Sequence, residues 1–169
     1  MATGIFGLVT LLGLQLLTPC LHIFNRDQVQ SSLDESALVS SRSIISDVLP
    51  STLGSITVNS QGFSCLSGAN YAATNGLPMW TTFVVYYTDG NCLWRKTWSP
   101  AGVVPTQATA RLTPAQLALA IHTTNGTEKS VAMNIANATF TLGTTLQVAA
   151  TLQAPGESSS LSFQVSPRR

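Results

Sequence analysis

Residues 5–24 read IFGLVTLLGLQLLTPCLHIF, a long and mostly apolar stretch. No charged side chain occurs before Arg26. At a rise of 1.5 Å per residue, a helix of this length spans about 30 Å, the thickness of the hydrocarbon core of a bilayer. Polar side chains within it can find partners on neighbouring helices. Residues 1–25 are therefore expected to form an N-terminal transmembrane helix.

The same stretch has two other interpretations. A signal peptide would be cleaved and lost, but the sequence has no basic region at the start and no small-x-small cleavage site after Phe24. A buried core helix fits less well, because the run is long and terminal. The residues after Phe24 favour retention of the segment.

Residues 26–50 keep a helical pattern. Apolar side chains recur at steps of three, four and seven, with a break at Ser41: Val29, Leu33, Ala37, Ile44, Ile45 and Val48. Neither Pro nor Gly occurs from Asn25 to Leu49, and Pro50 ends the run. The membrane helix is therefore expected to continue as an amphipathic helix, giving one rod of roughly 45 residues.

Residues 51–169 change character and predict a β-rich head. Trp80–Thr88 (WTTFVVYYT) is the strongest strand, because β-branched and aromatic residues fill it. Asp89-Gly90 supplies a tight turn, and Cys92–Trp98 returns as the hairpin partner. Further strands are expected at 55–59, 130–142, 145–152 and 160–165, and a loop at 62–78.

One short helix is expected within the head. Thr113-Pro114 has the form of an N-cap followed by proline at the first helical position, and the helix would run over 115–121 and end near Asn125-Gly126. The expected fold class is thus α+β, with an antiparallel sheet of five or six strands packed on the amphipathic half of the long helix.

Composition and motifs argue against several classes of function. The chain has 169 residues, of which 9% are charged, for a net charge of +1. Such a balance argues against long-range attraction to nucleic acid, which needs a dense basic face. The sequence contains no nucleophile motif and no glycine-rich phosphate loop. No metal-ligand spacing is found around the two histidines, His22 and His122. The sequence predicts neither enzymatic activity nor a metal or cofactor.

Four stretches, in this order and spacing, resemble the type IV pilin-like superfamily. They are FGLVTLL (6–12), FVVYY through Asp89-Gly90 to LWRK (83–96), residues 131–142, and SLSFQVSPRR (160–169). The superfamily includes minor pilins and the pseudopilins of type II secretion and DNA-uptake machines. The resemblance implies a pilin-like fold, in which the first helix anchors the subunit and then packs among neighbouring subunits.

The resemblance also assigns roles to the first residues. Processing would occur around Gly4, Ile5 and Phe6, although the family has a longer basic leader and no residue between the glycine and the phenylalanine. Assembly contacts would come from Phe6, Leu8, Val9, Thr10, Leu11 and Leu12. Thr10 stands where the family has a glutamate that pairs with a neighbour's amino group, and this fits a tip or low-copy subunit.

The implied partners are other pilin or pseudopilin subunits, an inner-membrane assembly platform and, before assembly, the bilayer. The head would lie in the periplasm or at the cell surface. The rival hypothesis is a secreted or signal-anchored β-rich binding module, such as an adhesin.

Two side-chain groups in the head have open interpretations. Cys65 and Cys92 could form a disulfide in an extracytoplasmic compartment or remain two buried thiols. Aromatic residues of the hairpin could pack in the core or, flanked by basic residues, offer a contact face for stacking on single-stranded nucleic acid. That candidate face comprises Trp80, Trp94, Arg95, Lys96 and Trp98.

Overall fold

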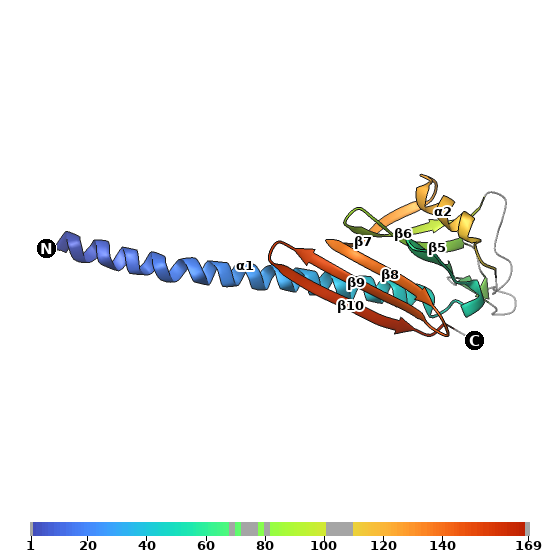
Figure 1. The fold of residues 1–169 in the computed structure, drawn as a ribbon, viewed down its shortest axis with the longest axis horizontal. Coiled ribbons are helices and arrows are strands. Elements are labelled where there is room, and N and C mark those ends of the chain that lie inside the picture. The colour runs from blue at the N-terminus through green and yellow to red at the C-terminus, as the bar shows by residue number, and fades with distance from the viewer. Residues whose placement is uncertain (1, 68–69, 72–77, 80–81, 101–109, 168–169) are drawn as a thin grey trace.

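The computed structural model describes residues 2–67, 70–71, 78–79, 82–100 and 110–167. For residues 2–14 and 16 it describes the helical backbone alone. The fold is α+β, with a long N-terminal helix and antiparallel sheets (Figure 1).

The first helix, α1, runs without a break from Ala2 to Val48. Pro19 lies inside it, and the helix continues on both sides. Pro50 cannot extend the helix, which closes on a bond from the Leu49 amide to the Ile45 carbonyl at 2.9 Å. The predicted single rod is confirmed. Figure 1 shows its N-terminal part extending well beyond the strands.

The strands form two main sheets, both antiparallel. The first has the order β1-β2-β5-β6-β7 and comprises Thr57–Val58, Gly62–Ser67, Thr82–Asp89, Cys92–Trp98 and Thr127–Met133. The second has the order β10-β9-β8 and comprises Glu157–Val165, Leu146–Ala154 and Ile135–Leu142. Two short strands, β3 (Asn70–Tyr71) and β4 (Pro78–Met79), pair separately, and a 3-10 turn, Leu53–Ser55, precedes β1.

The structure corrects the expected loop at 62–78. Its first part is β2, an inner strand between β1 and β5, in which Phe63, Cys65 and Leu66 are buried. The Gly, Ser and Asn content of the stretch hides this strand. Gly62 is needed at its start, because a Cβ there would lie 2.0 Å from the Tyr86 carbonyl oxygen.

The single strand expected at 130–142 is two strands, β7 and β8, in different sheets. Asn134 divides them with a φ of 63°, a left-handed conformation that asparagine adopts more readily than most residues. The chain therefore leaves the first sheet at this residue and starts the second. This is why the main strands of the head form two sheets instead of one sheet of five or six strands.

The second helix, α2, spans Pro114–His122 and confirms the prediction from the sequence. Thr113 caps it: its hydroxyl accepts from the Gln116 amide at 3.2 Å, and the Gln116 side chain accepts from the Thr113 amide at 2.8 Å. This reciprocal capping box satisfies two amides that the first turn leaves without partners.

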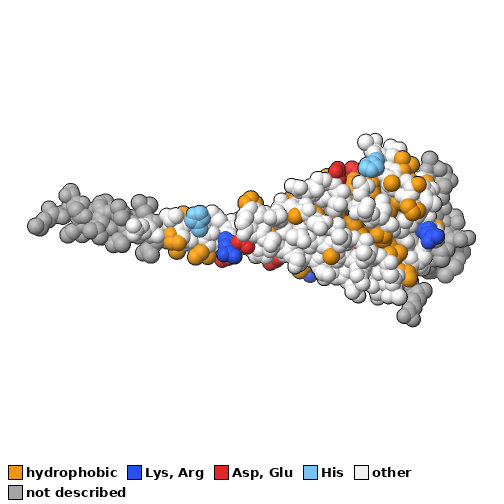
Figure 2. Space-filling view, in the orientation of Figure 1, with side chains coloured by type: hydrophobic (Ala, Val, Ile, Leu, Met, Phe, Trp, Pro, Cys, Tyr) orange, Lys and Arg blue, Asp and Glu red, His pale blue; other side chains and the backbone are white. Residues whose placement is uncertain are grey.

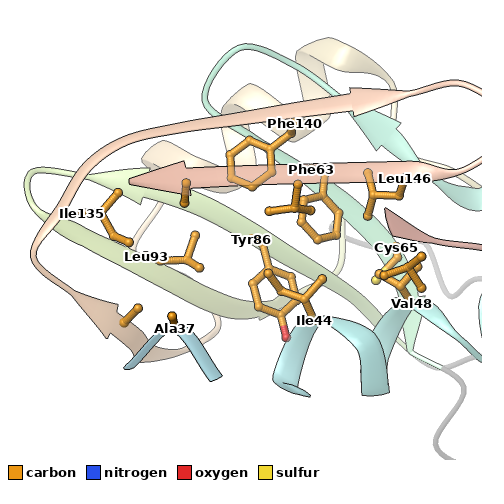
Figure 3. Close-up of a cluster of buried hydrophobic side chains, with 14 of the residues drawn as sticks. Ala37, Ile44, Val48, Phe63, Cys65, Tyr86, Leu93, Ile135, Phe140 and Leu146 are labelled. Carbon is orange, nitrogen blue, oxygen red and sulfur yellow. The ribbon is translucent and has the colours of Figure 1, made fainter. Parts of the chain in front are cut away.

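The main core joins α1 to both sheets. Ala37, Ile44 and Val48 point from α1 toward aromatic and aliphatic side chains of the strands (Figure 3). Phe63 of β2 stacks on Tyr86 of β5 with ring centroids 5.1 Å apart, and Phe140 of β8 lies 5.5 Å from Phe63. A second core lies on the other face of the five-stranded sheet, beneath α2.

The predicted Cys65–Cys92 disulfide is wrong: both cysteines are free, Cys65 buried and Cys92 half-buried. Cys65 pairs in register with Val84 of β5, whereas Cys92 pairs with Asp89. Five residues of strand separate these positions by about 17 Å, far beyond the Cα distance that a disulfide spans. The odd spacing also places the two side chains on opposite faces of the sheet.

Two leucines of α1 give a matched test of this packing. Leu33 is 1% exposed and Leu38 is 48% exposed. We expect Leu33→Ala to lower the free energy of unfolding by about 2–5 kcal/mol, because it removes core contacts and leaves a cavity. Leu38→Ala should change it by less than about 0.5 kcal/mol. Urea denaturation of the full chain in detergent, followed by tryptophan fluorescence, measures both, and equal losses would contradict the assigned packing.

Candidate functional site

The N-terminal part of α1 projects from the head with its apolar side chains uncovered. Leu17, Leu21, Ile23 and Phe24 are between 57% and 65% exposed. Val29 is the first half-buried side chain, and Leu33 is the first in the core. In Figure 2 hydrophobic side chains lie on the narrow stem before the charged residues at the head. Contiguous exposed apolar side chains mark a surface that another molecule or a membrane covers.

The residues expected to direct processing and assembly lie further toward the N-terminus on the same helix. Gly4, Ile5 and Phe6, and the assembly set Leu8, Val9, Thr10, Leu11 and Leu12, all have helical backbone. Their side chains lie outside the described residues. The structure therefore places these residues on one helix and gives no contacts for them.

Where side chains are described, no helix combines the length and the apolar character needed to cross a bilayer. The expected membrane segment, 5–24, enters this part of the chain only at Gln15 and from Leu17 onward.

Polar contacts secure α1 where it enters the head. Arg26 forms an ion pair with Glu157, at the start of β10. Further along the helix, the Ser159 hydroxyl donates to an Asp34 carboxylate oxygen at 2.8 Å, and the Gln30 amide donates to the same oxygen at 3.2 Å. These surface contacts lie along the edge strand β10 and add to the core packing that holds the helix on the head.

A second, half-buried cluster fixes the other end of α1 to the five-stranded sheet. Arg95 of β6 binds Asp47 with two hydrogen bonds, from Nε at 2.7 Å and from a terminal nitrogen at 3.1 Å. The Tyr86 hydroxyl donates to Asp47 at 2.6 Å and lies 2.8 Å from the Ser43 hydroxyl. Hydrogen bonding to Asp47 raises the pKa of Arg95, and burial followed by the Asp47 charge raises the pKa of Tyr86. The Arg95 guanidinium therefore stays charged, and the Tyr86 phenol keeps its proton, near neutral pH.

The opposite face of the same strand carries a buried lysine. Lys96 is wholly buried; its Nζ lies 2.7 Å from Glu128 and donates to the Thr123 carbonyl at the end of α2. The Tyr87 hydroxyl donates to Glu128 at 3.2 Å. The hydrogen bond from Lys96 lowers the pKa of Glu128, and burial together with Glu128 raises the pKa of Tyr87 to about 12.

The contact face proposed for the hairpin is not formed by its described members. Arg95 and Lys96 lie on opposite faces of β6, and each is held by a carboxylate. Trp98 is buried, and Trp94 is half-buried against the core beneath α2. The aromatic side chains therefore pack in the core, the other interpretation of the sequence. Trp80, also assigned to the face, lies outside the described residues.

The two ion pairs of the hairpin, Asp47–Arg95 and Lys96–Glu128, were not predicted from the sequence. Asp47 and Arg95 are 48 residues apart, and no local pattern links them. The one signal was position: Arg95 and Lys96 lie among aromatic residues in a predicted strand, and a charge that folding buries needs a partner.

The described residues contain no group of three or more His, Cys, Asp or Glu side chains placed to hold a metal ion. Comparisons with protein-family models, with curated proteins and with solved structures find no match to this chain.

The Lys96–Glu128 pair predicts acid sensitivity. Because folding lowers the pKa of Glu128, the pair contributes its full stability above the unfolded pKa of about 4.3 and loses it as the pH falls through the lower folded value. Thermal melting should show Glu128→Gln less stable than the wild type at pH 7, with the difference shrinking as the pH falls below about 4. The control is Glu35→Gln, on the outer side of α1. A difference that persists unchanged in acid would contradict the assigned pairing.

Proposed function

We propose that the chain is a structural subunit of a type IV pilin-like filament, a minor pilin or pseudopilin that assembles through its N-terminal helix. One observation carries the proposal: α1 passes without a break from a half that forms the core of the head to a half whose described apolar side chains the head leaves exposed.

The uncovered half needs a partner on energetic grounds. Burying one large aliphatic or aromatic side chain is worth about 1.5–3 kcal/mol, so several left in water are unfavourable. Residues 5–14, which precede this part on the same helix, are mostly leucine, valine, isoleucine and phenylalanine and carry no charge. Lipid before assembly, and helices of other subunits after it, would cover this half. The proposed location is the inner membrane, with the head in the periplasm or at the cell surface.

The way α1 is held suits a subunit that assembles through this helix. Contacts at both ends of the docked half, Arg26–Glu157 and Asp47–Arg95, fix the helix to both sheets. Packing of the projecting half against neighbours would therefore orient the head as well. The chain makes and breaks no covalent bond in this role, and the energy for assembly would come from the platform and its ATPase.

Thr10 limits the position that the subunit can take. A carboxylate in the membrane is costly unless it is paired. With Thr10 at the position where the resembling family has a glutamate, the subunit avoids that cost and gives up the pairing with a neighbour's amino group. We propose a low-copy or terminal place in the filament.

Replacing Leu12 with Asp tests the proposal. The charge should block helix packing while the head, whose first described core residue is Leu33, stays folded. We expect a tagged full-length chain, crosslinked in membranes of its native host, to form adducts with itself or with other subunits bearing similar helices, and Leu12→Asp to lose them.

The matched control is Thr139→Asp, which adds the same charge to an exposed position of β8. It should retain the adducts. Adducts that survive Leu12→Asp at wild-type yield would contradict the assembly role.

A further inference from the structure

The head has a hollow where three of its loops meet, at the end from which α1 emerges. Its volume is about 330 Å³, and it is lined by the β5–β6 turn at Asn91, the crossover between the sheets at 134–136 and the β9–β10 turn at 153–156. Figure 1 shows the β9–β10 turn beside α1 at this end. The volume lies within the range of small-molecule sites, and loops that a sheet holds in place often carry binding residues. We call this site the loop hollow.

Backbone hydrogen bonds fix the three loops to one another. The Ile135 amide donates to the Asn91 carbonyl at 2.9 Å, and the Gln153 amide donates to the Asn134 carbonyl at 2.7 Å. Asn134 has a φ of 63°, and the pairing of β8 with β9 is irregular between Ile135 and Asn137. Backbone conformations and bulges of this kind cluster at functional sites. The backbone therefore fixes the shape of the loop hollow.

Carboxamide side chains are the groups that the three loops bring together. Asn91, Asn134 and Gln153 each come from a different loop, and among the described residues their side-chain amides form no hydrogen bond to the chain. A second hollow, of about 300 Å³, adjoins the first at Asn134 and adds Gln28 and Ser32 of α1. A carboxamide both donates and accepts hydrogen bonds. The two hollows thus suit a ligand that carries many hydroxyl groups.

The lining of both hollows is uncharged. None of the described residues that line them is acidic or basic. Glu157, which follows the β9–β10 turn, is paired with Arg26 and lines neither hollow. A charged ligand, such as a phosphate or a peptide terminus, would lose its hydration here without gaining an opposite charge. The lining therefore favours an uncharged ligand.

The outer face of the second sheet adjoins the loop hollow and has the same chemistry. Gln153 lies on this face and also lines the hollow. Along β9 and β10 exposed residues alternate with less exposed ones, and the exposed ones are glutamine, alanine, threonine and serine alone. A ligand longer than the hollow would thus meet further uncharged hydrogen-bonding groups along the sheet.

We propose that the loop hollow binds a neutral saccharide. Sugar hydroxyls pair with the carboxamides of Asn91, Asn134 and Gln153, and the apolar face of a sugar ring contacts Ala154 and Pro155. A saccharide fits better than an extended peptide, because the loops offer side-chain amides and not the open edge of a strand. This binding activity goes beyond assembly through α1 and does not depend on it.

Binding of the full-length chain to an array of immobilised oligosaccharides tests the proposal, in a detergent without a sugar headgroup. The chain should bind neutral oligosaccharides above background. For the strongest of them, Asn134→Gly/Gln153→Ala should raise the Kd at least about tenfold, because two hydrogen-bonding side chains are lost. Glycine accepts the positive φ at position 134, so the variant keeps the backbone of the hollow.

The matched control is Asn125→Gly/Gln61→Ala, which removes the same two kinds of side chain from exposed positions outside both hollows. Its Kd should stay within about twofold of the wild type. Thermal melting checks that both double variants fold. Asn91→Ala, in the third loop, should also weaken binding.

Three results would overturn the proposal. One is that no neutral oligosaccharide binds above background. The second is binding of acidic oligosaccharides alone, which indicates a charged site elsewhere on the chain. The third is a folded Asn134→Gly/Gln153→Ala variant that binds as tightly as the matched control.

Discussion

The packing of the inner face of α1 against two sheets is the contact on which the rest of the structure depends. Leu33, Ala37, Ile44 and Val48 belong to the same core as strands from both sheets. Because the helix is rigid and continuous, fixing these side chains also fixes the direction of every residue N-terminal to them. The head thus holds the projecting part of α1 in a defined direction.

The few charged residues of the chain help to hold the helices on the head. In the head, Asp47–Arg95 holds the C-terminal end of α1 to the five-stranded sheet, and Arg26–Glu157 holds the helix to β10 where it emerges. Lys96–Glu128 lies beside the end of α2, and Lys96 also holds the carbonyl there. The Asp47–Arg95 and Lys96–Glu128 pairs are costly to break, since in each a largely buried partner would be left with a desolvated charge. The Arg26–Glu157 pair contributes less, because the Arg26 side chain is 71% exposed.

Local patterns in the sequence predicted the parts of the fold that depend on local chemistry. The repeat from Val29 to Val48, the Thr113 cap and the hairpin around Gly90 are of this kind, and all three are confirmed. The parts that depend on distant partners were missed. Gly62 starts a strand only because Tyr86 approaches it, Asn134 redirects the chain between sheets, and Arg95 is held by an Asp47 that lies far away in the sequence. The prediction of a disulfide was wrong for the same reason, because the spacing of cysteines in the sequence does not give the register in which the strands pair.

The head can support assembly through α1 only if the apolar half of this helix stays attached to it in the native protein. Intact mass and terminal sequencing of the protein, isolated from its host membrane, decide this. The chain should begin at or before Phe6 and keep residues 7–24. A native protein that begins after Phe24 would contradict the assembly role and would favour the signal-anchored or secreted binding module.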